Sequence, residues 1–490
     1  MDILASLDLL LSPSGLSLVA LGAVLGVVVG AIPGLTGAML IALTLPLTFS
    51  MSGESALILL VSMYVGSVSG GLITATLLRM PGTPASVMTT LDGYPMALAG
   101  RGQRAISLGV FASFFGGMIS WAFLVLLARP MADWSTRLGP FDYFALVLMA
   151  MALIAAVSGE SLSKGLFSGA LGVLTAMPGA SPATGEIRLT MGFRELDDGF
   201  KLLPVLIGVF AVSQIIHNIR TIDARPERLG LGRVALPNLA DLKTHWGNLL
   251  RSSLIGTWIG VLPGIGANIG SISAYAAAKG LSKAPEQFGK GSEEGVVASE
   301  AANNATVGGA LIPLIALGVP GSVIDAILLG ALVIHGLQPG PLLFEQNPGA
   351  VQAIVGAMFL ANIVMAVFVL ATVKWLARLA DIPKAVLIPV ILTFCVVGSY
   401  ALSNRIFDVW VMLAFGLVGF ALERFAIPLA PFVIGLVLAP LAEEHLSAGL
   451  MQSGGSYAPM LVSPFALVFT LLSLVIVAGA LWKSARTQEG

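Results

Sequence analysis

The stretch LGVVVGAIPGLTG at positions 25–37 is an apolar run that a Pro-Gly pair interrupts. A second stretch, IGTWIGVLPGIGA at positions 255–267, has two glycines and a Pro-Gly pair at the same offsets. Within hydrocarbon every peptide group must be hydrogen-bonded, so irregular backbone occurs only inside protein or beside a water-filled cavity. The two stretches therefore predict broken membrane helices at corresponding places in two halves of the chain.

A second pair of motifs follows the first in both halves. Gly-Gly at 70–71 precedes Pro-Gly at 81–82, and Gly-Gly at 308–309 precedes Pro-Gly at 320–321. Membrane helices also use glycine and proline for packing and kinks, so one such pair alone would be a weak signal. Two internal repeats with breaks in the same order are typical of secondary transporters, whose central sites lie at such breaks.

The composition of the 490-residue chain sets its class: 57% of the residues are hydrophobic and 10% are charged, with a mean hydropathy of +0.94. A soluble domain has about 25% charged residues because its surface faces water. The apolar segments predict an all-α polytopic membrane protein with about 10–12 transmembrane helices and some broken or re-entrant ones. Lipid is thus expected around the chain. A net charge of −1 with scattered basic residues predicts no nucleic-acid partner.

The longest polar interruption, at 218–247, separates a first repeat half, 1–217, from a second, 248–490. We call it the connector. Its basic residues predict a cytoplasmic location by the positive-inside tendency. These residues are Arg220, Arg225, Arg228, Arg233 and Lys243. A charged run from 279 to 294 resembles an ordinary solvated loop.

The broken helices define the candidate binding residues. An unwound turn leaves N–H groups at a positive helix end, which suit a carboxylate, and free carbonyls, which suit a cation. Hydroxyl and amide groups nearby can serve either ligand. The candidate substrate-binding residues are Pro33, Gly34, Thr36, Ser67, Ser69, Pro81, Gly82, Thr83, Ser86, Pro263, Gly264, Asn268, Asn303, Asn304, Pro320, Gly321 and Ser322.

Candidate sites for a coupling cation, sodium or a proton, come from polar groups that are costly to bury in a membrane. They are Asp92, Asn303, Asn304 and Asp325. Glu300 is a further intramembrane carboxylate that could carry a proton. Arg79 and Arg188 could clamp a carboxylate, but the preferred interpretation is that both reach to the membrane interface.

Motifs of enzymes and of ATP-driven pumps do not occur in the sequence. It has no HExxH, GxSxG or GxxxxGK[ST] pattern. Its one cysteine, Cys395, excludes a thiolate metal site within the chain. The sequence predicts that the chain is not an enzyme and has no cofactor besides a coupling cation. An ion channel and an intramembrane enzyme are the alternatives to a transporter.

Together the motifs resemble those of the large membrane subunit of the tripartite tricarboxylate transporters. The similarity covers nearly the whole chain, through GAIPGLTG, YVGSVSGG, PGTPASVMTTLDGYPMALAG, GEIRLTMG, GVLPGIGA, EAANNA and GVPGSVIDAILLGALVIHGLQPGPLLF. The resemblance implies cation-coupled uptake of carboxylates such as citrate across the bacterial inner membrane. It implies a small four-helix membrane subunit and a periplasmic solute-binding protein as partners. For the fold it implies two inverted repeats and an elevator-like movement.

One residue departs from the pattern of this family. Ser181 stands before GEIRLTMG, where the resemblance leads us to expect an aspartate. Any ion-binding or structural role of that carboxylate is therefore in doubt for this chain.

The energetics of uptake set a minimum for the coupling. One charge moved across about 100 mV corresponds to about 2.3 kcal/mol, so a trianion entering a negative interior costs about 7 kcal/mol. Three or more coupled cations would cancel that cost. Hydroxyl-rich turns favour sodium as the coupling ion, which is the preferred interpretation, whereas the intramembrane carboxylates could carry protons as the alternative.

Overall fold

The computed structural model describes residues 10–80, 83–157, 161–220, 229–231, 236–263, 266–379, 382–401 and 403–488. Most of them form helices, and two short strands, β1 (Gly179–Ala180) and β2 (Ile187–Arg188), make an antiparallel hairpin. Within these ranges nine helices are long and apolar enough to cross a membrane, and four shorter apolar helices accompany them. The predicted all-α polytopic class is confirmed. The total of 10–12 crossings stays a prediction.

The first half supplies helices that begin with α2, whose N-cap Ser12 accepts the N–H of Gly15. They are α2 (Pro13–Gly30), α3 (Gly37–Thr44), α4 (Gly53–Leu78), α5 (Val87–Leu98), α6 (Gly102–Ser135), α7 (Pro140–Val157), α8 (Leu162–Ala176), α9 (Leu202–Ile207) and α10 (Ser213–Arg220). The 3-10 turns η1 (Leu45–Thr48), η2 (Pro84–Ser86) and η3 (Arg194–Leu196) and the π turn η4 (Gly208–Val212) lie between them.

The second half begins with α11, which starts inside the predicted connector because Asn238 and Asp241 form a capping box there. Its helices are α11 (Leu239–Val261), α12 (Gly266–Leu281), α13 (Glu293–Leu317), α14 (Val323–Ile334), α15 (Pro341–Gln346), α16 (Pro348–Leu379), α17 (Lys384–Ala401), α18 (Ile406–Arg424), α19 (Leu429–Gln452), α20 (Ala458–Val462) and α21 (Pro464–Gln488). The 3-10 turn η5 (Pro285–Gln287) lies between α12 and α13.

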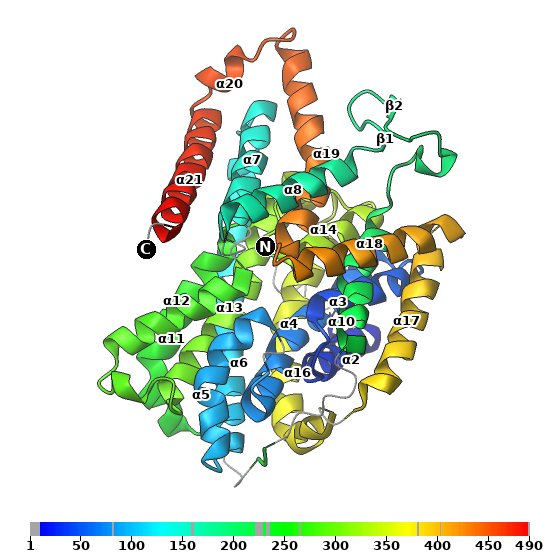
Figure 1. The fold of residues 1–490 in the computed structure, drawn as a ribbon. Helices are drawn as coiled ribbons and strands as arrows, with labels where there is room; N and C mark the ends of the chain where they lie inside the picture. Colours follow the sequence, from blue (N-terminus) through cyan, green and yellow to red (C-terminus); the bar gives the residue numbers. More distant parts are fainter. Residues whose placement is uncertain are drawn as a thin grey trace.

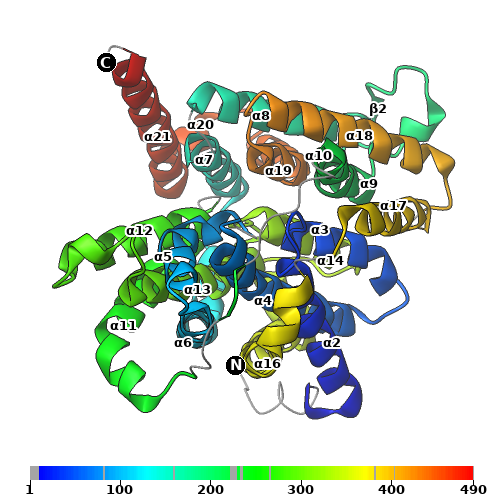
Figure 2. The same cartoon turned by 60° about the horizontal axis from the view of Figure 1, so that its bottom comes forward.

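The helices form two groups that lie side by side (Figures 1 and 2). The core group contains α2 to α6 and α11 to α16, and within it α13 packs on α6 and α11, and α2 on α4. The outer group contains α7 to α10 and α17 to α21, in which α19 packs on α7 and α8, and α21 on α7. Each half of the chain thus supplies its first helices to the core group and its last helices to the outer group.

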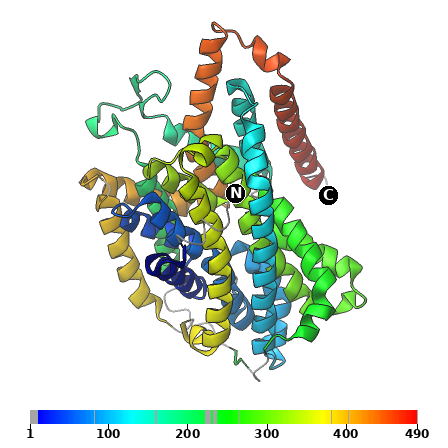
Figure 3. The same ribbon diagram turned by 180° about the vertical axis from the view of Figure 1, so that it is seen from behind.

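Two long helices of the core group, α6 and α16, run beside one another, as the view from behind shows (Figure 3). They have 34 and 32 residues, so each is about 50 Å long at 1.5 Å per residue. That exceeds the thickness of about 30 Å of a hydrocarbon core. The ends of α6 therefore mark the two opposite faces of the molecule.

Glycines let the central helices of each half approach closely. A Cβ added to Gly26 or Gly30 of α2 would lie 2.5 Å from a carbonyl oxygen of α4. In the second half, a Cβ on Gly256 or Gly260 of α11 would lie 2.3 or 2.5 Å from a carbonyl oxygen of α13. The glycines of the two matching sequence stretches thus have the same packing role. The division into halves, the inverted relation between them and an elevator-like movement stay predictions.

Candidate functional site

The predicted breaks fall between helices in both halves. They separate α2 from α3, α4 from α5, α11 from α12 and α13 from α14. Gly34 has a φ of 84°, a left-handed conformation that glycine adopts without strain. The structure describes Pro33, Gly34, Pro263, Pro320 and Gly321 of these turns, whereas Pro81, Gly82 and Gly264 lie outside the described residues.

One break from each half meets in a region that we call the first break region. It consists of the turn before α3 and the turn before α14, both packed against α4. A Cβ built on Gly37, the first residue of α3, would lie 3.3 Å from Ile324 in the first turn of α14. Two positive helix ends are therefore adjacent inside the protein.

Predicted site residues cap both of these helix ends. The Thr36 hydroxyl accepts the N–H of Met39 at 3.2 Å, and the Ser322 hydroxyl accepts the N–H of Asp325 at 3.3 Å. The Ser322 hydroxyl also lies 3.3 Å from that of Tyr64 in α4. Ser67, one turn along α4, donates to the carbonyl of Tyr64 and borders Gly37. Thr36, Ser67 and Ser322 are thus brought together.

The carboxylate of Asp325 lies at this place beside weakly placed donors. The side chain is completely buried, and neither carboxylate oxygen makes a hydrogen bond of ordinary geometry with a described residue. The Ser322 and Tyr64 hydroxyls are its polar neighbours. A buried carboxylate without well-aligned donors is costly, so this position is suited to an ion or a proton.

The other two breaks meet in what we call the second break region. The turn η2 before α5 packs against α12, the helix that follows Pro263. Thr83 and Ser86 share a hydrogen bond of 2.8 Å between their hydroxyls there. A Cβ on Gly71 of α4 would lie 2.7 Å from the Ser86 hydroxyl. Asn268, in the first turn of α12, is exposed.

Asn303 and Asn304 lie near the middle of α13, and both are buried. Ser69 of α4 donates to Asn304 Oδ1 at 2.7 Å, and Asn304 Nδ2 donates to Ser113 of α6 at 2.7 Å. The amide of Asn303 makes no hydrogen bond of ordinary geometry with a described residue, although it lies beside Glu300. Ser69 and Asn304 are therefore joined, whereas Asn303 has no well-aligned partner among the described residues and lies next to the Glu300 carboxylate.

Asp92 has a different environment from the other candidate carboxylates. Its Oδ1 accepts the N–H groups of Gly289, Gly291 and Ser292 at 2.8 to 2.9 Å. Its Oδ2 accepts the hydroxyl of Tyr275 at 2.8 Å. Asp92 therefore holds the loop that leads into α13. Its predicted role as a coupling site stays a prediction.

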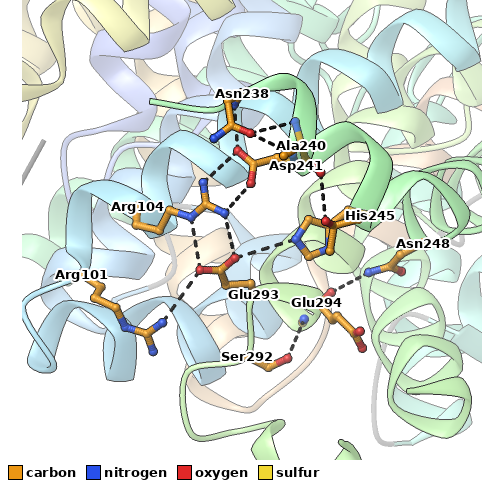
Figure 4. Close-up of polar contacts among 12 residues, drawn as sticks. Arg101, Arg104, Asn238, Ala240, Asp241, His245, Asn248, Ser292, Glu293 and Glu294 are labelled. Atoms are coloured by element: carbon orange, nitrogen blue, oxygen red, sulfur yellow. Dashed lines mark hydrogen bonds and ion pairs between the residues drawn. The ribbon is translucent and has the colours of Figure 1, made fainter. Parts of the chain in front are cut away.

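An ion-pair cluster at the start of α6, α11 and α13 was not foreseen from the sequence (Figure 4). Arg104 donates to both oxygens of Asp241 and to both oxygens of Glu293. His245 and Arg104 lower the pKa of Glu293 to about 2, and Arg104 lowers the pKa of Asp241. Glu293 thus begins a helix and pairs with cations, and does not belong to a solvated loop.

Ser181 and Arg188, at the β hairpin, both contact Glu443 of α19. The Ser181 hydroxyl donates to Glu443 Oε1 at 2.6 Å, and the Arg188 guanidinium to Glu443 Oε2 at 2.5 Å. Arg188 therefore fastens the hairpin to α19 and is not a free carboxylate clamp. Arg79 lies 5.8 Å from the centre of the Tyr94 ring, as a cation–π partner.

A cavity of about 950 Å³ opens between the two groups of helices. Its lining includes the hairpin residue Ala180, Ser135 at the end of α6, Leu436 of α19 and Val319, which precedes the break before α14. Leu231 and Asp241 of the connector lie at the opposite end of α6, where the N–H of Gln103 donates to the carbonyl of Leu231 and Arg104 pairs with Asp241. The cavity therefore approaches the first break region from the face opposite the connector.

These features define a class: a polytopic helical membrane protein whose interior holds broken helices and buried polar groups. Residues 16–434 match the family described as the tripartite tricarboxylate transporter TctA family. The chain therefore belongs to this family, and it is the membrane subunit of a tricarboxylate transporter within a tripartite system. The fit of the sequence motifs to this family is confirmed.

Two relatives from Agrobacterium vitis are similar to the chain. One, an uncharacterised 52.8 kDa protein in the TAR-I ttuC′ 3′ region, is 33% identical over 495 residues that cover 100% of this chain and 98% of the relative. The other, an uncharacterised protein in the TAR-II ttuC′ 3′ region, is 35% identical over 48% of this chain and 97% of the relative. No solved structure matches the chain.

Proposed function

We propose that this chain performs cation-coupled secondary active uptake of tricarboxylates, such as citrate, or other small carboxylates across the bacterial inner membrane. It receives its substrate from a periplasmic solute-binding protein and works with a small four-helix membrane subunit. The chain has no catalytic role in this proposal. The substrate binds at the broken helices and a cation, sodium or a proton, is carried with it.

The observation that supports this function best is the first break region. Two helix N-termini, one from each half, lie together there and can stabilise a carboxylate through their N–H groups. Asp325, which makes no hydrogen bond of ordinary geometry with a described residue, lies in the same region and can attract a cation. An anion and a cation that bind together would balance each other's charge, which is the requirement for coupled transport.

The location of the cavity supports delivery from the periplasm. It lies on the face opposite the connector, which the positive-inside tendency places in the cytoplasm. Its described lining includes Asp198, Glu444 and His445 but neither lysine nor arginine. A passage with carboxylates at its mouth would not collect anions by itself, which agrees with a separate binding protein that delivers the substrate.

Uptake into proteoliposomes tests the proposal. The chain, its small subunit and its binding protein are reconstituted, and a panel of labelled tricarboxylates and dicarboxylates is offered under an inward sodium gradient or an inward proton gradient. Saturable accumulation that collapses when one gradient is removed is the expected result. Omission of the binding protein is the matched control and is expected to lower uptake.

Two outcomes would contradict the proposal. One is that no carboxylate accumulates under either gradient although the proteins are folded and inserted. The other is a flux that does not saturate and is far above the turnover of a carrier, which would favour an ion channel.

A further inference from the structure

Glu300 is a completely buried carboxylate two turns into α13. Its Oε1 accepts the Thr89 hydroxyl of α5 at 2.5 Å, and its Oε2 accepts the Ser113 hydroxyl of α6 at 3.2 Å. Both donors are neutral. Because an ionised carboxylate inside a membrane protein is costly unless a cation or several donors offset its charge, this group requires a partner that its surroundings do not supply.

The groups around Glu300 form a continuous polar network through four helices. Asn304 Nδ2 donates to the Ser113 hydroxyl at 2.7 Å and to the backbone carbonyl of Glu300 at 3.2 Å. The Ser69 hydroxyl of α4 donates to the other end of this amide. Glu300 is therefore linked to α4, α5 and α6, which come from the first half of the chain, while its own helix comes from the second.

No charged side chain described by the structure makes a hydrogen bond or an ion pair with Glu300. The helices α4, α5, α6, α11, α12 and α14 and the short α15 pack on α13. Their titratable groups have partners elsewhere or lie near helix ends, as Asp325 does in the first turn of α14. These groups, with Arg101 just before α6 and those of α13 itself, are Glu54, Tyr64, Asp92, Tyr94, Arg101, Arg104, Arg129, Asp133, Asp241, Lys243, His245, Arg251, Tyr275, Lys279, Glu293, Glu294, Asp325 and Glu345. The charge of Glu300 is thus offset by neutral dipoles alone.

The network can accommodate a proton without losing a hydrogen bond. Thr89 has a second partner, the Ser299 hydroxyl at 3.1 Å, and Ser299 in turn donates to the carbonyl of Val296. When Glu300 is ionised, Thr89 donates to it. When a proton adds to Oε1, the new O–H can donate to Thr89, and the Thr89 hydroxyl turns toward Ser299. Both protonation states are therefore hydrogen-bonded.

Apart from the amide oxygen of Asn303, which makes no hydrogen bond of ordinary geometry with a described residue, the described groups at Glu300 offer few free ligands to a sodium ion. Both carboxylate oxygens are already bonded to hydroxyl groups, and α13 is a regular helix from Glu293 to Leu317, so its carbonyls there are used by the helix. The carbonyl of Glu300 also accepts the Asn304 amide. We propose that Glu300 is a proton-binding site of this transporter, and that the proton it takes up and releases is carried with the carboxylate.

This inference rests on the proposed function and adds the identity of one coupling ion and its position. A proton from water adds to a carboxylate oxygen on one side of the membrane and returns to water on the other, and nothing is oxidised or reduced. In the neutral form the hydrogen bonds with α5 and α6 remain, but they are no longer charge-assisted and are weaker. The proton therefore weakens the attachment of α13 to helices of the other half.

The test uses Glu300→Gln in the complete reconstituted complex. Glutamine keeps an oxygen that can accept from Thr89 and an amide that can donate to Ser113, so the network stays intact while titration is lost. Accumulation of labelled citrate is measured against the imposed pH difference, and each coupled proton changes the accumulation ratio about tenfold per pH unit. Citrate exchange without any gradient is measured in parallel. Glu294→Gln, on the same helix, is the matched control.

The wild-type protein and Glu294→Gln are expected to show the same dependence on the pH difference. Glu300→Gln is expected to lower the response by about tenfold per pH unit, the contribution of one proton, while citrate exchange continues. An infrared band of a protonated carboxyl group that titrates in the wild type and is missing in Glu300→Gln would be the direct sign of the site.

The inference is overturned if Glu300→Gln keeps the wild-type response to the pH difference. It is also overturned if the folded variant loses exchange and accumulation together, because Glu300 would then serve structure or substrate binding. Uptake in the wild type that responds to sodium alone would contradict it and leave the proposed function standing. A wild-type protein that accumulates no carboxylate under either gradient would instead contradict the proposed function.

Discussion

Asp92 and Asp325 are both completely buried aspartates near a helix break, yet they have opposite environments. Asp92 accepts three N–H groups and one hydroxyl. Asp325 accepts no hydrogen bond of ordinary geometry from a described residue. Burial alone therefore does not separate a structural carboxylate from one that is available to a ligand. The number of donors separates them.

The backbone explains the difference. Gly289 and Gly291, in the loop around Asp92, have φ values of 84° and 106°, which allow three N–H groups to converge on one oxygen. Around Asp325, the Ser322 hydroxyl already caps the first turn of α14. One N–H group of this helix end is therefore occupied by the Ser322 hydroxyl. The N–H groups that have no partner within the helix can bind a substrate.

The largest effect on stability is expected for Asp92→Ala. This change leaves the N–H groups of Gly289, Gly291 and Ser292 without an acceptor, and the bonds from Gly289 and Gly291 are only partly buried while that from Ser292 is buried. A buried N–H group without an acceptor costs about 1–3 kcal/mol, and a partly exposed one costs less because water can replace the acceptor. The free energy of unfolding in detergent, measured with a chemical denaturant, should fall by about 2–3 kcal/mol. Asp92→Asn keeps an acceptor oxygen and is the control. Equal stability of the alanine variant and the wild type would refute a structural role for Asp92.

A smaller loss is expected for Arg104→Met, which leaves Asp241 and Glu293 without their shared cation. The cluster is partly exposed to solvent, so the expected loss is about 1–2 kcal/mol. A double-mutant cycle with Asp241→Asn measures the coupling between the two residues. If the effects of the two single changes on the free energy of unfolding are additive, the ion pair between Arg104 and Asp241 does not stabilise the protein.

Asp325→Asn should change stability by less than about 1 kcal/mol, because the carboxylate makes no hydrogen bond that the change removes. The main effect of Asp325→Asn is expected on the rate of transport and not on stability. Gradient-driven uptake should fall at least about tenfold, since the cation attracted by the carboxylate is lost. Thermal unfolding and uptake of the same preparation test this directly. A large loss of stability with normal uptake would place Asp325 in the same class as Asp92.

The smallest effect is expected for Ser181→Asp, which introduces the residue expected from the family. Its carboxylate would lie beside Glu443, but Arg188 and solvent would offset most of the repulsion. The free energy of unfolding is expected to fall by about 0.5 kcal/mol. A second change, Glu443→Gln in the same chain, should restore this stability. Proteolysis of the hairpin under native conditions measures the difference. A strong gain in stability would show that the family aspartate has a different set of contacts.

The sequence predicted several features that depend on local pattern. The low charge content identified a membrane protein, and the positions of Pro33 and Pro263 predicted breaks that the helices confirm. The sequence also named Thr36, Ser67 and Ser322 as candidate binding residues, and the structure places these three residues close together. It did not foresee the contacts of Arg104, because its partners lie 137 and 189 positions away. The family was predicted from the sequence motifs, and the match of residues 16–434 confirms it.

The sequence by itself determined which segments are apolar enough to enter a membrane and where the helices are interrupted. Apolar segments require lipid, and Pro-Gly pairs interrupt helices wherever they stand. Only the tertiary structure decided which breaks meet, that α3 and α14 begin side by side, and that Asp92 is saturated with donors while Asp325 is not. The physical reason is that hydrogen bonds and helix dipoles act over a few ångströms in space, and the residues that share them are separated by hundreds of positions in the chain.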